Sequence, residues 1–131
     1  SQKQITTHYL DKSVDLDAFT KISFIYPHAV ASVKVGQGVK SEGELIVSGT
    51  KGYVYVPAPW WKTDYFEIRY ENPANNKRYF YQLDGEGIRY EIVFFAKAIE
   101  THMMNTYIDG PVSLAMVRIF ESFYNGKMIE I

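Results

Sequence analysis

Two adjacent tryptophans in a proline-rich segment are the side chains best suited to contact a small molecule. Trp60 and Trp61 follow Pro57-Ala58-Pro59 and precede Lys62. Proline restricts the backbone, and each indole offers an apolar surface with one N–H donor. Two interpretations stay open: at least one indole lines a ligand pocket, or one or both cap the core of a sheet.

Recognisable catalytic and metal-binding patterns are otherwise absent from the sequence. His8, His28 and His102 have none of the spacings typical of metal ligands. The chain lacks cysteine, which excludes thiolate metal sites and a cysteine nucleophile, and it contains no Gly-x-Ser-x-Gly motif. We therefore expect structural or solvated roles for the three histidines, no metal site, and no catalytic residue in this chain.

Two glycine pairs match phosphate-binding loops only in part. Gly36-Gln37-Gly38 begins like a dinucleotide fingerprint, but Ser41 stands at the third glycine position and the flanking pattern is a hairpin. Gly85-Glu86-Gly87 precedes a predicted helix, and we interpret it as a strand-to-helix turn rather than an anion site. No cofactor-binding residue is expected here.

The first two-thirds of the chain has the pattern of β-strands. Aromatic and β-branched residues are dense, alternate in places such as 18–26, and are interrupted by Gly, Pro and Asn clusters. The pattern predicts strands over 5–10, 18–26, 29–35, 44–48, 53–56, 65–71 and 78–83, with a short strand or a tail at 128–131.

The periodicity then changes to that of α-helices. Apolar residues recur at helical spacing from Ile88 to Ile99 and from Val112 to Phe123, which predicts helices near 86–102 and 111–125. Strands followed by helices indicate an α+β fold. We expect a single domain over 1–131, with an open, mainly antiparallel or mixed sheet of six to seven strands and two C-terminal helices on one face.

Composition narrows the class of protein further. Of the 131 residues, 47% are hydrophobic, which indicates a folded core, and the net charge of -1 argues against nucleic-acid and anionic-membrane partners. No apolar stretch is long enough to span a membrane. The absence of cysteine fits a reducing, cytoplasmic location.

Aromatic side chains are expected on both faces of the sheet. Phe66, Ile68 and Tyr70 alternate with Tyr65, and Phe80 alternates with Tyr79 and Tyr81. Two helices cover one face only, so the other face would expose a large apolar patch. We therefore predict a homodimer that forms through the sheet face.

An ordered series of motifs carries a family resemblance over most of the chain. The series is Gly49-Thr50-Lys51-Gly52 entering a strand, the Trp60-Trp61 loop, Gly85-Glu86-Gly87-Ile88-Arg89-Tyr90-Glu91, and Ser113-Leu114-Ala115. It resembles the C-terminal domain of the Gfo/Idh/MocA oxidoreductases, especially the dihydrodiol-dehydrogenase-like branch.

The resemblance implies a role but no chemistry for this chain alone. Such enzymes pair an N-terminal Rossmann domain, which binds NAD or NADP and carries the catalytic Lys, with a C-terminal domain that completes the pocket for a sugar, polyol or diol-like substrate. Only the second part is present here. The resemblance makes Trp60, Trp61 and Tyr90 candidates for the substrate-pocket wall, although Tyr90 is equally open to a packing role.

Two other functions stay open. A freestanding sheet-based module that binds a small ligand would suit the aromatic content, and a purely structural dimerisation domain would need no ligand. The sequence of the parent gene discriminates between the oxidoreductase and these alternatives. About 150 or more upstream residues with Gly-x-Gly-x-x-Gly and Glu-Lys-Pro would favour the oxidoreductase, and an initiator Met just before Gln2 would contradict it.

Overall fold

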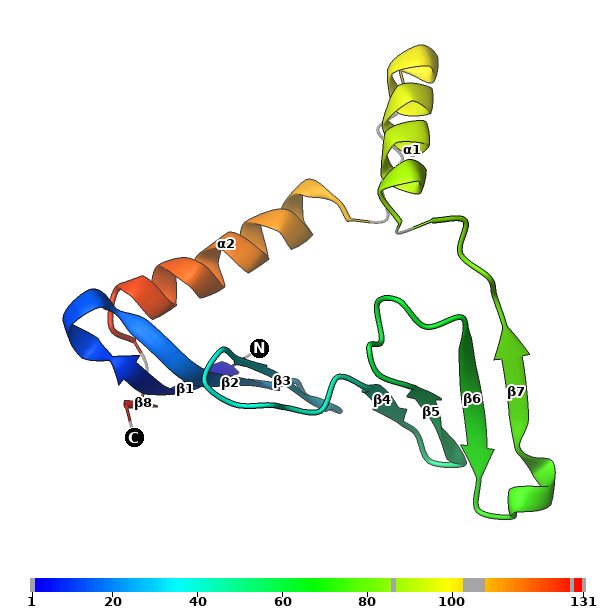
Figure 1. The fold of residues 1–131 in the computed structure, drawn as a ribbon, viewed down its shortest axis with the longest axis horizontal. Helices are drawn as coiled ribbons and strands as arrows, with labels where there is room; N and C mark the ends of the chain where they lie inside the picture. The colour runs from blue at the N-terminus through cyan, green and yellow to red at the C-terminus, as the bar shows by residue number, and fades with distance from the viewer. Residues whose placement is uncertain (1, 86, 103–107, 128, 131) are drawn as a thin grey trace. The chain divides into compact units, whose positions relative to one another are not determined.

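The computed structural model describes residues 2–85, 87–102, 108–127 and 129–130. The chain divides into two compact units. Unit 1 comprises Ser1–Ser41 and Thr106–Ile131, and unit 2 comprises Glu42–Asn105. Each unit contains a four-stranded sheet and one helix, as Figure 1 shows.

The sheet of unit 1 has the strand order β3-β2-β1-β8. Its strands are β1 (Gln2–Asp11), β2 (Leu16–Ile25), β3 (Val30–Gly36) and the short β8 (Ile129–Glu130). The first three pair antiparallel, and β8 pairs parallel with β1. The turn between β1 and β2 closes through a short 3-10 helix, η1 (Lys12–Val14), where the Asp11 carboxylate accepts the backbone N–H of Ser13.

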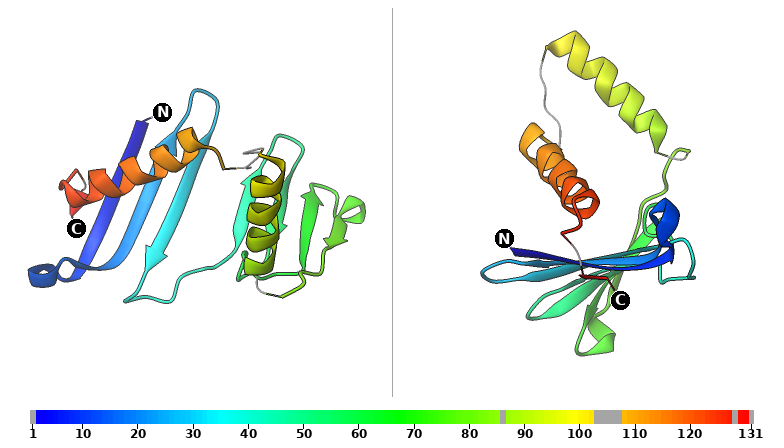
Figure 2. Two further views of the ribbon diagram at one scale, coloured as in Figure 1. Left: turned by 90° about the horizontal axis from the view of Figure 1, so that it is seen from above. Right: turned by 90° about the vertical axis from the view of Figure 1, so that its left-hand side faces the viewer.

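One helix crosses a face of this sheet. Helix α2 (Gly110–Tyr124) begins at Asp109, whose carboxylate accepts the backbone N–H of Val112, with Pro111 in the first turn. Figure 2 shows α2 running across the strands of unit 1. The Lys3 ammonium donates to the carbonyl of Arg118 at 3.0 Å, which ties β1 to the helix.

The small buried core of unit 1 lies where β1 meets β2. Ile5 and Ala18 are its buried apolar residues, and Thr7 and Thr20 are buried beside them. The hydroxyls of Thr7 and Thr20 lie 2.7 Å apart, and the hydroxyl of Thr20 donates to the Asp17 carboxylate at 2.7 Å. Because each buried hydroxyl has a partner, these polar groups are accommodated without leaving an unsatisfied atom.

The sheet of unit 2 is a meander of four antiparallel strands in chain order. They are β4 (Leu45–Ser48), β5 (Gly52–Val56), β6 (Tyr65–Tyr70) and β7 (Lys77–Phe80). A 3-10 helix, η2 (Pro73–Asn75), joins the last two strands. Asn72 caps it through the N–H of Ala74, and the side chain of Asn76 accepts the N–H of Tyr70.

The two faces of this second sheet differ in chemistry. One face, which we call the tyrosine–arginine face, carries the following residues according to the strand register: Ile46, Ser48, Tyr53, Tyr55, Tyr65, Glu67, Arg69, Arg78 and Phe80. The opposite, apolar face carries Leu45, Val47, Val54, Val56, Phe66, Ile68, Tyr70, Lys77 and Tyr79. Phe66 and Tyr79 stack across the β6–β7 pair with ring centroids 5.1 Å apart.

Helix α1 (Ile88–Thr101) belongs to unit 2 and buries none of its side chains. It ends at His102, which adopts a left-handed backbone conformation (φ 53°) and donates its N–H to the carbonyl of Ile99. The apolar stripe of Ile88, Ile92, Phe95 and Ile99 is exposed. Within the described residues, α1 therefore leaves an amphipathic face without a partner.

The α+β class, the antiparallel strands and the two C-terminal helices are confirmed. Two details differ from expectation. The strands form two sheets rather than one, and the helices belong to different units rather than packing together on one face. Glu86, Met128 and Ile131, which fall within predicted elements, lie outside the described residues.

Candidate functional site

The tryptophan loop is held to the start of unit 2 by backbone hydrogen bonds. The N–H of Trp60 donates to the carbonyl of Gly43 at 2.8 Å, and the N–H of Lys62 donates to the carbonyl of Pro59 at 2.9 Å. The two indoles meet edge to face, with ring centroids 6.0 Å apart. Trp60 is 50% exposed and Trp61 is 59% exposed, so neither of them caps a core.

A recess of about 350 Å³ opens beside one of these indoles. Its lining residues come from the end of the tryptophan loop and from the chain after β7: Trp61, Lys62, Thr63, Asp64, Gln82, Leu83 and Gly85. We call it the Trp61 recess. It combines one aromatic plane with a hydroxyl, a carboxylate, an amide and an ammonium group.

Backbone contacts fix the walls of the Trp61 recess. The N–H of Tyr81 donates to the carbonyl of Asp64 at 2.7 Å, which joins the two lining segments. The N–H of Asp84 donates to the hydroxyl of Tyr90 at 2.8 Å, and the Asp84 carboxylate pairs with Arg89. The first turn of α1 therefore holds the segment that carries Gln82, Leu83 and Gly85.

The three residues singled out from the sequence thus occupy one region, in three different positions. Trp61 lines the recess, Trp60 forms an edge-to-face pair with Trp61, and Tyr90 lies outside the lining and holds Asp84 in place. Sequence reasoning missed Asp64 and Gln82, because only the pairing of β6 with β7 brings these two polar residues to the same place. Asp64 immediately precedes the predicted strand over 65–71, and Gln82 lies near the end of the predicted strand over 78–83, so antiparallel pairing of these two strands was the signal that could have found them.

The recess has groups suited to recognition of a hydroxyl-bearing ligand. An indole plane packs against the C–H groups of a ligand, while carboxylate and amide groups accept and donate hydrogen bonds to hydroxyls. No histidine, cysteine or serine lines it. In the described part of the chain, no group of three His, Asp or Glu residues could hold a metal ion.

A slightly larger recess of about 390 Å³ lies at the turn between β4 and β5. Its walls are mainly the turn backbone and apolar side chains such as Val47, Val54 and Ile68, and its only charged lining residue is Lys51. It offers few groups that would orient a ligand, so the Trp61 recess is the stronger candidate despite its smaller volume.

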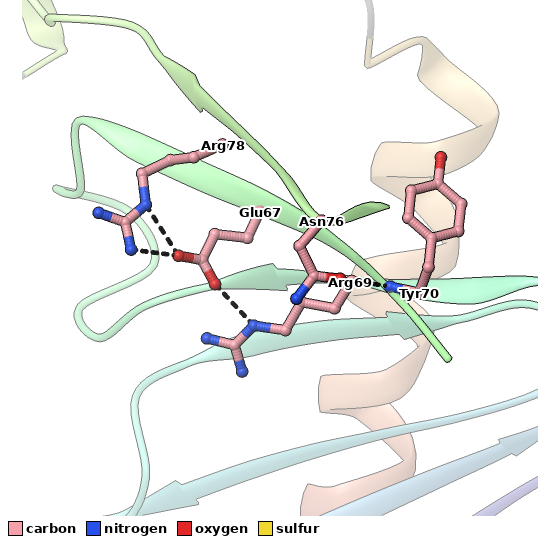
Figure 3. Close-up of polar contacts among 5 residues, drawn as sticks. All are labelled: Glu67, Arg69, Tyr70, Asn76 and Arg78. Atoms are coloured by element: carbon pink, nitrogen blue, oxygen red, sulfur yellow. Dashed lines mark hydrogen bonds and ion pairs between the residues drawn. The ribbon is translucent and has the colours of Figure 1, made fainter. Parts of the chain in front are cut away.

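A second cluster, not found from the sequence, lies on the tyrosine–arginine face (Figure 3). The Glu67 carboxylate accepts Nε of Arg69 at 2.6 Å through one oxygen, and Nε of Arg78 at 2.8 Å, together with an Nη2–H of Arg78, through the other. The guanidinium of Arg69 lies 4.1 Å from the ring centroid of Tyr55, and that of Arg78 lies 4.8 Å from that of Tyr65.

These contacts shift the pKa values of Glu67 and Arg69. Hydrogen bonds from Arg69 and then Arg78 hold the pKa of Glu67 below its usual range, because both favour the ionised carboxylate. Contacts with Tyr53 and then Glu67 raise the pKa of Arg69. Alternation alone places Glu67 and Arg69 on one face, but Arg78 joins them only through the β6–β7 register, which the sequence did not specify.

Comparison with known proteins gives this chain no family. No protein-family model matches it, and no curated protein matches it. None of the helices in the described residues is long and apolar enough to cross a membrane.

Proposed function

We propose that this chain is the C-terminal substrate-pocket and subunit-contact domain of an NAD(P)-dependent oxidoreductase that acts on a sugar, polyol or diol-like substrate. In this proposal the chain supplies one wall of the pocket and performs no chemistry alone. The motif series that resembles Gfo/Idh/MocA enzymes supports it. The observation that carries it is the Trp61 recess, which an indole lines together with groups that bind hydroxyls.

The polar lining favours a neutral, hydroxyl-rich ligand. Asp64 is exposed and makes no side-chain hydrogen bond with any described residue, so its carboxylate is available to accept from two ligand hydroxyls. Gln82 offers both a donor and an acceptor beside it. A carboxylate also disfavours an anionic ligand at short range, although Lys62 moderates this effect.

The cofactor would have to bind elsewhere in the parent enzyme. Gly36-Gln37-Gly38 contains the glycines that most resemble a dinucleotide loop, but the N–H groups of Gln37 and Gly38 both donate to the carbonyl of Ala18. A side chain at Gly38 would approach Cβ of Ala18 to 3.0 Å, so this glycine serves packing within unit 1. The described residues of this segment do not fit NAD or NADP.

Two observations test this assignment. Titration of the chain with NADH, followed by nicotinamide fluorescence, should give no saturable binding, because the N–H groups of the glycine segment that most resembles a phosphate-binding loop already donate to Ala18. The reading frame upstream of Ser1 should encode a Rossmann domain with Gly-x-Gly-x-x-Gly and Glu-Lys-Pro. Saturable NADH binding at micromolar concentration, or an initiator Met just before Gln2, would contradict the proposal; the latter would favour a freestanding module that binds ligand in the same recess.

A further inference from the structure

A third recess, of about 240 Å³, lies where the β4–β5 turn meets the end of β6. We call it the turn recess. Its lining includes Thr50, Lys51, Tyr53, Arg69 and Glu71, and it shares no residue with the Trp61 recess. We propose that the turn recess binds a small monocarboxylate that also carries a hydroxyl group. This second binding site goes beyond the proposed function and does not depend on it.

Backbone contacts fix both walls of the turn recess. The N–H of Gly49 donates to the carbonyl of Gly52 at 2.9 Å, which closes the turn that forms the first wall. Strand register pairs Gly52 with Tyr70, so the end of β6 forms the second wall. The N–H of Tyr70 donates to the side chain of Asn76 at 2.8 Å (Figure 3). The lining side chains therefore extend from backbone that is held in place on both sides.

Each wall contributes one cation. Lys51 is exposed at the turn and makes no hydrogen bond or ion pair with any described residue. Arg69 is 34% exposed; its Nε–H donates to Glu67 at 2.6 Å, and its guanidinium lies 4.1 Å from the ring centroid of Tyr55. These contacts leave the outer fork of Nη groups toward a ligand, and a guanidinium fork matches a planar carboxylate through two parallel hydrogen bonds.

The same contacts restrain Arg69 before a ligand arrives. A solvated arginine loses much rotamer freedom when it orders around a ligand. In this chain Glu67 and Tyr55 already restrict the guanidinium, as the close-up of Arg69 and Glu67 shows (Figure 3). Binding therefore orders mainly Lys51, and less conformational entropy is lost than at a site built from two unrestrained cations.

The net charge of the lining favours an anion with a single charge. Lys51, Arg69 and Glu71 sum to one positive charge. Outside the lining, the charge of Glu67 is balanced by Arg78, with which it forms an ion pair. A monocarboxylate therefore neutralises the recess, whereas a phosphate dianion would exceed the available positive charge and would be repelled by Glu71.

Glu71 supplies the second element of recognition. Its carboxylate is exposed, has no ion pair within the described residues, and can accept a hydrogen bond from a ligand hydroxyl. An amino acid could donate an ammonium group to Glu71, but a zwitterion gains nothing from the surplus positive charge. The volume lies below the range of about 300–1,000 Å³ that is typical of sites for drug-sized ligands. A small hydroxycarboxylate fits both the charge and the size.

Exposure of the charged groups sets the expected strength of binding. Ion pairs between exposed groups contribute little and are screened by salt. We therefore expect dissociation constants in roughly the millimolar range, and weaker binding as salt rises.

Nuclear magnetic resonance of the full ¹⁵N-labelled chain tests the proposal at the turn itself, through the amide signals of Lys51 and Gly52. Glycerate, a hydroxycarboxylate, should shift these signals with saturation. Propionate, which lacks the hydroxyls, should bind several-fold more weakly. Glycerol, which lacks the carboxylate, should give no saturable shift, and inorganic phosphate should bind more weakly than glycerate.

Two variants assign the interactions to named side chains. Lys51→Ala should raise the dissociation constant for glycerate about tenfold. Lys77→Ala is the matched control, because Lys77 is an exposed cation on the opposite face of the same sheet that does not line the turn recess; it should change the constant less than about twofold. Glu71→Ala should abolish the preference for glycerate over propionate, because it removes the acceptor for the ligand hydroxyl.

Glycerate shifts that stay linear up to about 100 mM would overturn the proposal, since binding would then be weaker than any specific site requires. Equal weakening by Lys51→Ala and Lys77→Ala, or tighter binding of phosphate than of glycerate, would also overturn it. A preference for glycerate that survives Glu71→Ala would remove the role of Glu71 and contradict the hydroxyl requirement. The turn recess contains no tryptophan, so indole fluorescence reports separately on the Trp61 recess.

Discussion

At the scale of single residues, the Glu67 carboxylate is held by hydrogen bonds from two arginines. Two guanidinium groups hold it in its charged form, so its folded pKa lies below its unfolded value of about 4.3. A carboxylate with a depressed pKa stabilises the fold above its unfolded pKa, and this stabilisation is lost as pH falls through the folded pKa.

The consequence is a pH-dependent difference in stability between the wild-type chain and the Glu67→Gln variant. At neutral pH the wild type should unfold at higher urea concentration than the variant, and the gap should narrow as pH falls from about 5 to 2. Glu71→Gln is the control, because Glu71 has no ion pair within the described residues. A gap that persists unchanged at the lowest pH would show that Glu67 acts through packing rather than charge.

Tyr90 has a positioning role beside the Trp61 recess. Its hydroxyl accepts the N–H of Asp84, and Phe at this position would keep the ring and lose the acceptor. Tyr90→Phe should cost about 0.5–1.5 kcal/mol in the free energy of unfolding and should weaken any ligand of the recess several-fold. Tyr124→Phe on α2 is the control, because Tyr124 is 81% exposed. Equal effects from both variants in urea denaturation and ligand titration would remove this role from Tyr90.

At the scale of elements, the turn between β4 and β5 depends on a glycine for close strand approach. A Cβ at Gly52 would lie 2.5 Å from the backbone oxygen of Arg69, which belongs to the paired strand β6. Because that neighbour is backbone rather than a flexible side chain, relief requires the two strands to separate.

Gly52→Ala should therefore destabilise the chain by about 1–3 kcal/mol, the usual cost of overpacking. Gly49→Ala in the same turn is the matched control, since its nearest contact would be an ordinary 3.4 Å from the Gly52 oxygen. Thermal unfolding followed by circular dichroism compares them. A Gly52→Ala chain as stable as Gly49→Ala would show that β5 and β6 pair less closely than described.

The individual elements could be predicted from sequence because their signals are local. Alternation of apolar residues placed β2, and helical stripes placed α1 and α2, each within a few residues of its observed bounds. Strand pairing is not local, so the division into two sheets and the β6–β7 register could not be predicted. The polar half of the Trp61 recess and the Glu67 cluster both depend on that register.

At the scale of the whole chain, many large apolar side chains are exposed to solvent. The stripe of α1, residues of the apolar face of unit 2 such as Val47 and Tyr79, and residues of α2 such as Val117 and Phe120 are solvent-exposed. Soluble proteins seldom leave apolar patches of more than a few hundred Å² uncovered. This exposure fits a domain that covers its surfaces with partner domains or subunits, as the proposed function requires.

The central claim is that the Trp61 recess binds a hydroxyl-rich ligand, and tryptophan fluorescence tests it most directly. Both tryptophans of the chain lie at the site, so Trp60→Phe leaves Trp61 as the only reporter, and Trp61→Phe leaves Trp60. Titration with hexoses, hexitols and vicinal diols should give a saturable change in the Trp60→Phe chain, and Asp64→Asn should weaken it about tenfold, as expected for one charged hydrogen-bonding partner. A signal that does not saturate, or that a hydroxyl-free osmolyte reproduces, would contradict the account.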